Sequence, residues 1–139
     1  MSEACPCGRV DANRKPVGYA ECCGRYIDHF DCTPAPDAPS LVRSRYTAFV
    51  RNRVPYIRAT WLAANCPEDP AALPGTIWLG LELRAARDID ADHAEVEYVA
   101  RYRMRTGRAV RLHERARFIR EQGRWLYVDG DMLGVSGVK

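Results

Sequence analysis

The sequence predicts an α+β protein in which a small cysteine-rich segment precedes helices that pack on one antiparallel sheet. Three observations lead to this fold class. Four of the six cysteines fall between residues 5 and 23. Residues 40–64 carry apolar side chains at helical spacing, and the chain from Thr76 onward alternates apolar and polar residues. Helices followed by a run of strands are typical of α+β domains, whose helices cover one face of a sheet.

The totals describe a globular chain of modest size. With 139 residues, 47% of them hydrophobic and 28% charged, it is one domain, or one small domain with an appendage. No apolar run approaches the roughly 20 residues of a bilayer-spanning helix. The amino end lacks the basic and apolar regions of a secretory signal, so we expect no membrane association and a cytoplasmic location. The net charge of +3 permits acidic partners but does not imply nucleic acid.

Four cysteines at the amino end form two close pairs, Cys5 with Cys7 and Cys22 with Cys23. Stable disulfides are rare in a reducing compartment, and neither pair is well spaced for an unstrained bond within itself. Four thiolates complete a tetrahedral shell for zinc, which favours sulfur ligands. The pattern therefore favours one structural Zn²⁺ per chain. Disulfides between the pairs, free thiols and an iron–sulfur cluster remain as alternatives.

The other two cysteines lie outside this pattern. We expect Cys32 and Cys66 to be buried or partly buried free thiols. His29 is near enough in sequence to replace a missing metal ligand, although four sulfur atoms already complete the shell.

A proline-rich stretch separates the cysteine-rich residues 1–33 from the rest of the chain. Three prolines within residues 34–39 disfavour a helix and favour an extended linker. The domain boundary is therefore predicted there, with residues 40–139 forming the α+β domain. Ser40 is predicted to cap a helix that begins LVRSRYTAFVRN. A second helix is predicted from about Pro55 to Ala64, because proline suits a first turn.

Alternation then assigns the faces of three long strands, and a turn at residues 121–123 leads into a last strand that begins RWLYVDGD. Regular alternation of this kind indicates an antiparallel sheet with one solvent-exposed face. In the first strand Trp78 is predicted to face outward, and the inward residues are Ile77, Leu79, Leu81, Leu83 and Ala85. The inward residues of the second and third strands are Val96, Tyr98, Ala100, Tyr102 and Met104, then Val110, Leu112, Glu114, Ala116 and Phe118.

Glu114 is a charged residue on a predicted apolar face. A buried carboxylate must be paired, hydrogen-bonded or protonated. It is interpreted first as a structural ion pair with an arginine of the first helix, assisted by tyrosine hydroxyls. The alternatives are a pocket carboxylate that acts as an acid or base, and a strand bulge that exposes it. The candidate pocket residues are Glu114, Tyr98, Tyr102, Arg43, Arg45 and Tyr46.

No catalytic residue is assigned, because the sequence lacks a metalloprotease motif, a phosphate-binding loop and a nucleophile elbow. The predicted outer face of the sheet carries a stripe of arginines with acidic residues between them. Cross-strand ion pairs on a solvated or dimeric face explain this stripe better than binding of an acidic protein or RNA. Few aromatic residues lie on that face, which weakens the case for RNA. The arginines are Arg101, Arg103, Arg105, Arg111, Arg115 and Arg117.

Several segments resemble known proteins. C-P-C-G followed by A-E-C-C-G resembles the SEC-C zinc-binding motif. Together with LVRSRYTAFV, ATW, LHERARF and GRWLYVDGD, it resembles the YchJ-like family of bacterial proteins, whose function is largely uncharacterised. The spacer from Arg9 to Glu21 is longer than in the usual motif, so it either loops out or marks a degraded site. The resemblance implies that one structural zinc ion is bound by Cys5, Cys7, Cys22 and Cys23.

The same resemblance implies a nuclear-transport-factor-2-like cone for residues 40–139, with a curved sheet around the helices, often a pocket, and a homodimer through the sheet. Two functions follow. One is a non-catalytic adaptor, since similar modules in the SecA ATPase contact protein partners and the ribosome. A closed shell of four cysteines suits that role. The other is a small-molecule-binding protein or enzyme that uses the pocket around Glu114. Basic residues would fit the knuckle to an acidic partner, namely Arg9, Arg14, Lys15 and Arg25.

Overall fold

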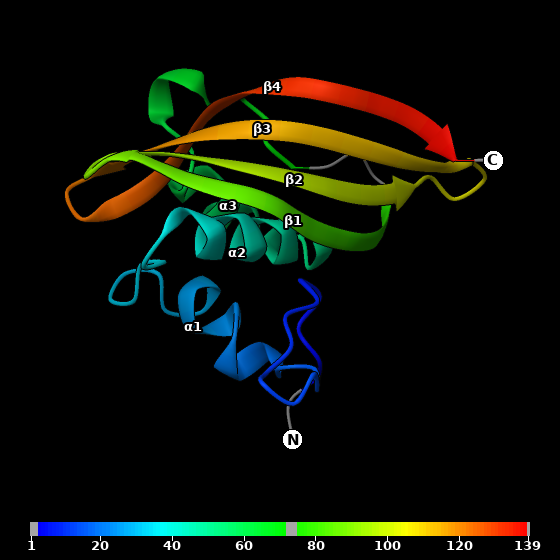
Figure 1. The fold of residues 1–139 in the computed structure, drawn as a ribbon, viewed down its shortest axis with the longest axis horizontal. Coiled ribbons are helices and arrows are strands. Elements are labelled where there is room, and N and C mark those ends of the chain that lie inside the picture. The colour runs from blue at the N-terminus through cyan, green and yellow to red at the C-terminus, as the bar shows by residue number, and fades with distance from the viewer. Residues whose placement is uncertain (1–2, 72–74, 139) are drawn as a thin grey trace.

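The chain folds into three layers, which are an amino-terminal cysteine-rich segment, a helical layer and a four-stranded sheet (Figure 1). The structure, a computed structural model, describes residues 3–71 and 75–138. Helix α2 (Ala38–Val50) lies in the middle, with the sheet on one side and the amino-terminal segment on the other (Figure 1). The helices cover one face of the sheet, so the predicted α+β class is confirmed.

The remaining elements follow in chain order. The amino-terminal layer contains the 3-10 turn η1 (Tyr19–Glu21) and the short helix α1 (Gly24–Ile27). After α2 come α3 (Val54–Ala59) and the 3-10 turn η2 (Ala63–Asn65). The strands are β1 (Ile77–Asp90), β2 (His93–Arg103), β3 (Ala109–Glu121) and β4 (Arg124–Val138). Among the described residues, no helix is both long and apolar enough to cross a membrane.

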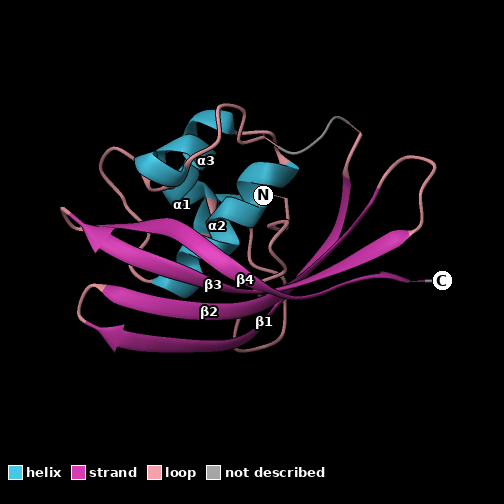
Figure 2. Cartoon of the chain, turned by 90° about the horizontal axis from the view of Figure 1, so that it is seen from above, coloured by secondary structure: helices cyan, strands magenta, loops and turns pink. Residues whose placement is uncertain are grey.

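All neighbouring strands are antiparallel and follow the chain order β1-β2-β3-β4. The long strands twist and bend over the helical layer (Figure 2). The inward faces predicted for β2 and β3 are confirmed at their centres, where Val96, Ala100, Ala116 and Phe118 are buried. The cone-like arrangement therefore follows from long alternating strands that curve around one helical layer.

Helix α2 begins earlier than predicted. Ser40 is not its cap; instead the Asp37 carboxylate accepts a 2.8 Å hydrogen bond from the Ser40 backbone N–H. Pro39 fits within the first turn, where no intrahelical bond from its nitrogen is needed. The helix thus starts inside the predicted linker, and Ala35 in the same stretch is buried rather than extended into solvent.

Helix α3 ends five residues before the predicted end at Ala64, because the residues that follow the helix pair with strand β4. The Tyr127 N–H donates to the Thr60 carbonyl oxygen at 2.8 Å, and the Leu62 N–H donates to the Tyr127 carbonyl oxygen at 2.8 Å. These bonds hold the chain around Trp61 in an extended bridge, so the helix cannot continue.

Strand β1 departs from the predicted alternation because its register shifts between Trp78 and Gly80 and again between Leu83 and Ala85. Leu79, predicted inward, is 46% exposed. Trp78, predicted outward, packs against the rings of Tyr46 and Tyr102, with centroid distances of 5.5 Å in both pairs. Ala85, predicted inward, is exposed. A bulge reverses the faces of the residues beyond it, and nothing in the period-two pattern marks it.

Candidate functional site

The four cysteines of the amino end meet in one buried cluster. Their sulfur atoms lie within 4.8 Å of one another, and each residue is at most 5% exposed. The Sγ atom of Cys22 lies 3.6 Å from that of Cys7 and 4.0 Å from that of Cys23. A tetrahedral zinc ion with Zn–S bonds of about 2.3 Å sets its sulfur ligands about 3.8 Å apart. The arrangement fits a metal site, and none of these thiols forms a disulfide.

The long spacer between the two cysteine pairs loops out as a hairpin and leaves the ligands together. The Cys5 N–H donates to the Val17 carbonyl oxygen at 2.9 Å, and the Val17 N–H donates to the Arg9 carbonyl oxygen at 3.0 Å. Gly8, directly after Cys7, has a φ of 79°, a conformation that favours glycine and allows the sharp turn. The extra residues therefore enlarge an exposed loop without spreading the sulfur atoms.

Helix α2 touches this cluster with two side chains one turn apart. The Cys5 sulfur lies 3.6 Å from the hydroxyl of buried Thr47. Arg43 donates from Nη1 to the Cys7 carbonyl oxygen at 3.2 Å and to the Cys7 sulfur at 3.8 Å. Arg43 does not line the predicted pocket. It lies two positions before Arg45, and residues two positions apart point to nearly opposite sides of a helix. It contacts the cysteine cluster instead.

Burial of the thiols makes a cation necessary for four thiolates to coexist. Burial, with the nearby Cys7 and Cys5, raises the pKa of Cys22 to about 12. Hydrogen bonds from Cys23 and Cys7 lower the pKa of Cys5. The Cys5 sulfur can thus carry negative charge on its own, whereas the Cys22 thiol resists deprotonation. A divalent ion compensates this charge, and metal binding then releases the remaining protons.

Replacement of Arg43 with methionine is expected to weaken metal binding by about tenfold, because hydrogen bonds to ligand sulfurs stabilise their negative charge. The measurement is competition for Zn²⁺ with a chromophoric chelator. Arg58→Met is the matched control, since this exposed arginine donates to the Glu68 carbonyl oxygen and contacts no cysteine. Equal zinc affinities for the two variants would show that Arg43 has no influence on the site.

A cavity of about 210 Å³ lies between α2 and the sheet. Two charged residues from opposite layers face it, Arg45 of α2 and Glu114 of β3. Tyr102 does not line the cavity and packs instead on Trp78 at its border. The rest of the wall is mainly aromatic and aliphatic, with rings from Tyr46, Phe49, Trp61, Trp78, Tyr98, Phe118 and Tyr127.

Tyrosine hydroxyls, rather than an arginine, satisfy Glu114. This residue is 3% exposed. Tyr98 donates to its Oε1 atom, and Tyr127 donates to its Oε2 atom at 2.5 Å. Burial, reinforced by the Glu114 charge, raises the pKa of Tyr98 well above its usual value, so its hydroxyl keeps its proton. Within the described chain, no salt bridge joins Glu114 to Arg45, and the predicted ion pair is wrong.

Tyr127 was missed by the sequence reasoning because no face was assigned to the last strand. The signal was present, since Trp125 and Tyr127 alternate with polar or smaller neighbours. Trp125 is buried, and Tyr127 packs on Phe118 with a centroid distance of 5.8 Å. The pairing of β3 with β4 also shifts register between Arg117 and Phe118, so simple alternation does not hold across these two strands.

Arg45 is held as a buried cation beside Glu114. Its Nη1 atom donates to the Ile57 carbonyl oxygen at 3.0 Å and to the Thr60 hydroxyl at 2.8 Å. Its guanidinium lies 4.9 Å from the Trp61 ring centroid and 5.0 Å from that of Tyr127. Burial lowers the pKa of Arg45 to about 10, which leaves it charged at neutral pH.

Acidic residues compensate arginines on the outer face of the sheet. Arg87 pairs with Glu95 at 2.6 Å across β1 and β2. Arg117 pairs with Asp129 at 2.6 Å and Asp131 at 2.9 Å across β3 and β4. Cross-strand ion pairing is therefore present on this face, as the interleaved charges predicted.

The two other cysteines and His29 lie apart from the metal cluster. Cys66 is partly buried, as predicted, but Cys32 is exposed. Its backbone N–H donates to the His29 carbonyl oxygen at 3.1 Å in a turn on the surface after α1. His29 is also exposed and does not belong to the group of potential metal ligands.

Comparison with known proteins adds three findings. Residues 37–130 match the family described as "YchJ, middle NTF2-like domain". A UPF0225 protein of Polaromonas sp. (strain JS666) is 60% identical over 127 residues, which cover 91% of each chain. A UPF0225 protein of Polaromonas naphthalenivorans is 53% identical over 139 residues, covering 96% of this chain and all of that one.

A solved structure shares the fold over almost the whole chain. It is the solution structure of a SEC-C motif containing protein from Rhodopseudomonas palustris. The TM-score is 0.79 at 25% sequence identity, and the match covers 95% of this chain and 100% of that one. The likeness therefore includes the cysteine-rich layer as well as the sheet.

Proposed function

The chain belongs to the YchJ-like family of UPF0225 proteins, and from this premise we propose that it is a zinc-binding, non-catalytic adaptor. Its four-cysteine knuckle, residues 3–33, holds one structural Zn²⁺ and contacts an acidic protein partner. The middle domain has the NTF2-like fold of this family. The solved structural neighbour is a SEC-C motif containing protein, which supports the assignment of the four cysteines as metal ligands.

The burial of a complete ligand set is the observation that supports this proposal. All four sulfur atoms come from this chain, face one another and are shielded from solvent. Zinc with four cysteine ligands has no open position for a substrate or water, whereas catalytic zinc keeps one. The ion would therefore hold the two cysteine pairs together and fix the shape of the hairpin between them.

The hairpin of residues 8–16 supplies the contact surface. Every residue in it is exposed. It carries Arg9, Arg14 and Lys15 against one acidic residue, Asp11, whose carboxylate accepts the Lys15 N–H at 3.1 Å. Val10, which is bridged to Pro16 beside the turn, is 50% exposed and adds an apolar contact. A basic surface with an apolar centre is complementary to an acidic protein.

Reversal of charge in the hairpin is expected to remove the partner without disturbing the metal site. The variant is Arg14→Glu with Lys15→Glu, and partners are captured from a bacterial lysate and identified by mass spectrometry. The control is Arg105→Glu with Arg108→Glu, which changes the net charge equally at an exposed turn between β2 and β3. Acidic proteins should be recovered with the wild type and the control but lost with the hairpin variant.

A measurement of zinc content keeps this test specific. Zinc content must stay near one ion per chain in both variants, so that any loss reflects the surface charge. If the hairpin variant retains the same proteins as the control, the hairpin is not the docking surface and the adaptor proposal fails.

A further inference from the structure

We propose that the cavity between α2 and the sheet is a binding site for a small, neutral, ring-sized compound with a hydrogen-bond acceptor directed to Arg45. This site is separate from the metal-bound knuckle, because its wall comes from α2, the bridge after α3 and the sheet. It would give the protein a ligand in addition to the proposed protein partner.

Unused donors of Arg45 are the first reason. The side chain is 7% exposed, and a guanidinium has five N–H groups. In the described part of the chain, hydrogen bonds engage only its Nη1 atom. The only fully buried side-chain nitrogen or oxygen without a partner there is Nε1 of Trp61. The Nε and Nη2 groups of Arg45 therefore border accessible space, and the space beside Arg45 is the cavity.

The separation of two opposite charges is the second reason. Arg45 and Glu114 face the same cavity without forming a salt bridge. Their charges cancel over the site as a whole. An anionic ligand would satisfy Arg45 but would add a second negative charge beside Glu114. A cationic ligand would likewise place a second positive charge beside Arg45. A neutral compound keeps this balance.

The wall selects the shape of the ligand. Aromatic rings from α2 and the sheet surround a volume of about 210 Å³. An engineered cavity of about 150 Å³ with an apolar lining binds benzene, so this cavity has room for one substituted ring. A carbonyl oxygen on that ring would accept from Arg45, and an adjacent N–H would donate to the Glu114 carboxylate, which can accept further hydrogen bonds. A primary aromatic amide has both groups.

The experiment is a titration of zinc-loaded, ¹⁵N-labelled protein with benzamide, followed through the tryptophan indole N–H signals. Trp61 and Trp78 line the cavity, whereas Trp125 lies outside it. The expected result is saturable shifts of the first two signals and none of the third. Benzoate and toluene are the comparison probes. Each should bind about tenfold more weakly, because one adds charge and the other lacks the acceptor.

Two variants connect the shifts to the cavity. Ala100→Leu fills the space from β2 and leaves both charges in place, so it should abolish benzamide binding in a protein that remains folded. Arg45→Met, where it folds, should reduce the preference for benzamide over toluene, because only the bond from the amide N–H to Glu114 remains. The proposal is overturned if millimolar benzamide leaves the Trp61 and Trp78 signals unmoved, if benzoate binds best, or if Ala100→Leu binds as the wild type does.

Discussion

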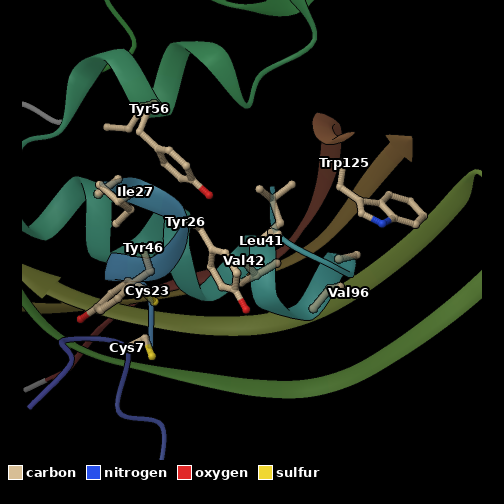
Figure 3. Close-up of a cluster of buried hydrophobic side chains, with 14 of the residues drawn as sticks. Cys7, Cys23, Tyr26, Ile27, Leu41, Val42, Tyr46, Tyr56, Val96 and Trp125 are labelled. Atoms are coloured by element: carbon tan, nitrogen blue, oxygen red, sulfur yellow. The ribbon is translucent and has the colours of Figure 1, made fainter. Parts of the chain in front are cut away.

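Replacement of Cys7 with serine is expected to destabilise the whole chain rather than to release only its amino end. Cys7 is 1% exposed and belongs to the same buried cluster as Leu41, Val42 and Tyr46 (Figure 3). A serine hydroxyl is a poor zinc ligand, so with the proposed zinc site the variant would lose both the ion and a buried contact. Because α2 lies between the knuckle and the sheet (Figure 1), one of its faces packs against the knuckle and the other packs against the sheet.

The size of this effect follows from the metal. Structural zinc sites contribute an apparent binding free energy of about 10–16 kcal/mol in zinc-finger peptides, whereas a whole domain is stable by about 5–15 kcal/mol. We expect Cys7→Ser to lower the free energy of unfolding by more than about 4 kcal/mol. Urea unfolding followed by tryptophan fluorescence, with zinc content measured on the same samples, tests this value.

The matched control is Cys32→Ser, an exposed cysteine outside the cluster. It should change the free energy of unfolding by less than about 0.5 kcal/mol and retain the zinc. A contrary outcome is a zinc-free Cys7→Ser protein whose sheet and α2 amide signals match those of the wild type. The knuckle would then be an independent appendage, and residues 34–39 would act as the linker that the prolines predicted.

Much of the sheet could be predicted because side-chain alternation follows directly from strand geometry. The pattern placed Val96, Ala116 and Phe118 in the core, and the structure confirms them. It failed in β1, where the register shifts beside Leu79 and Trp78 packs against Tyr46 on the covered face. Register shifts are tertiary effects, and a single sequence carries no local signal for them.

The candidate site was predicted unevenly for a similar reason. Neither cysteine pair is well spaced for an unstrained disulfide within itself, so the four thiols already favour a shared metal. Glu114 was conspicuous because it interrupts an apolar face. Its partners were harder to foresee, since Tyr127 reaches it from the adjacent strand β4. The direction of Arg43 could have been foreseen, because two helical positions place it far around the helix from Arg45.

Replacement of Gly130 with alanine is expected to be the most damaging single-methyl change near the cavity. A Cβ atom on residue 130 would lie 2.8 Å from Cδ of Glu114 and closer still to its Oε2 atom. The carboxylate would have to leave the hydroxyls of Tyr98 and Tyr127, and a buried charge without partners is costly. We expect the free energy of unfolding to fall by about 2–4 kcal/mol, measured by urea denaturation.

Two comparisons separate this clash from a general intolerance of strand β4 to side chains. Gly134→Ala lies on the same strand, where an added Cβ meets nothing within 4 Å, so it should change stability by less than about 0.5 kcal/mol. In a Glu114→Ala background, the Gly130→Ala change should cost under about 1 kcal/mol, because the group it displaces is gone. If Gly130→Ala costs the same with and without the Glu114 carboxylate, the requirement for glycine comes from the backbone, and the carboxylate is not fixed by this strand.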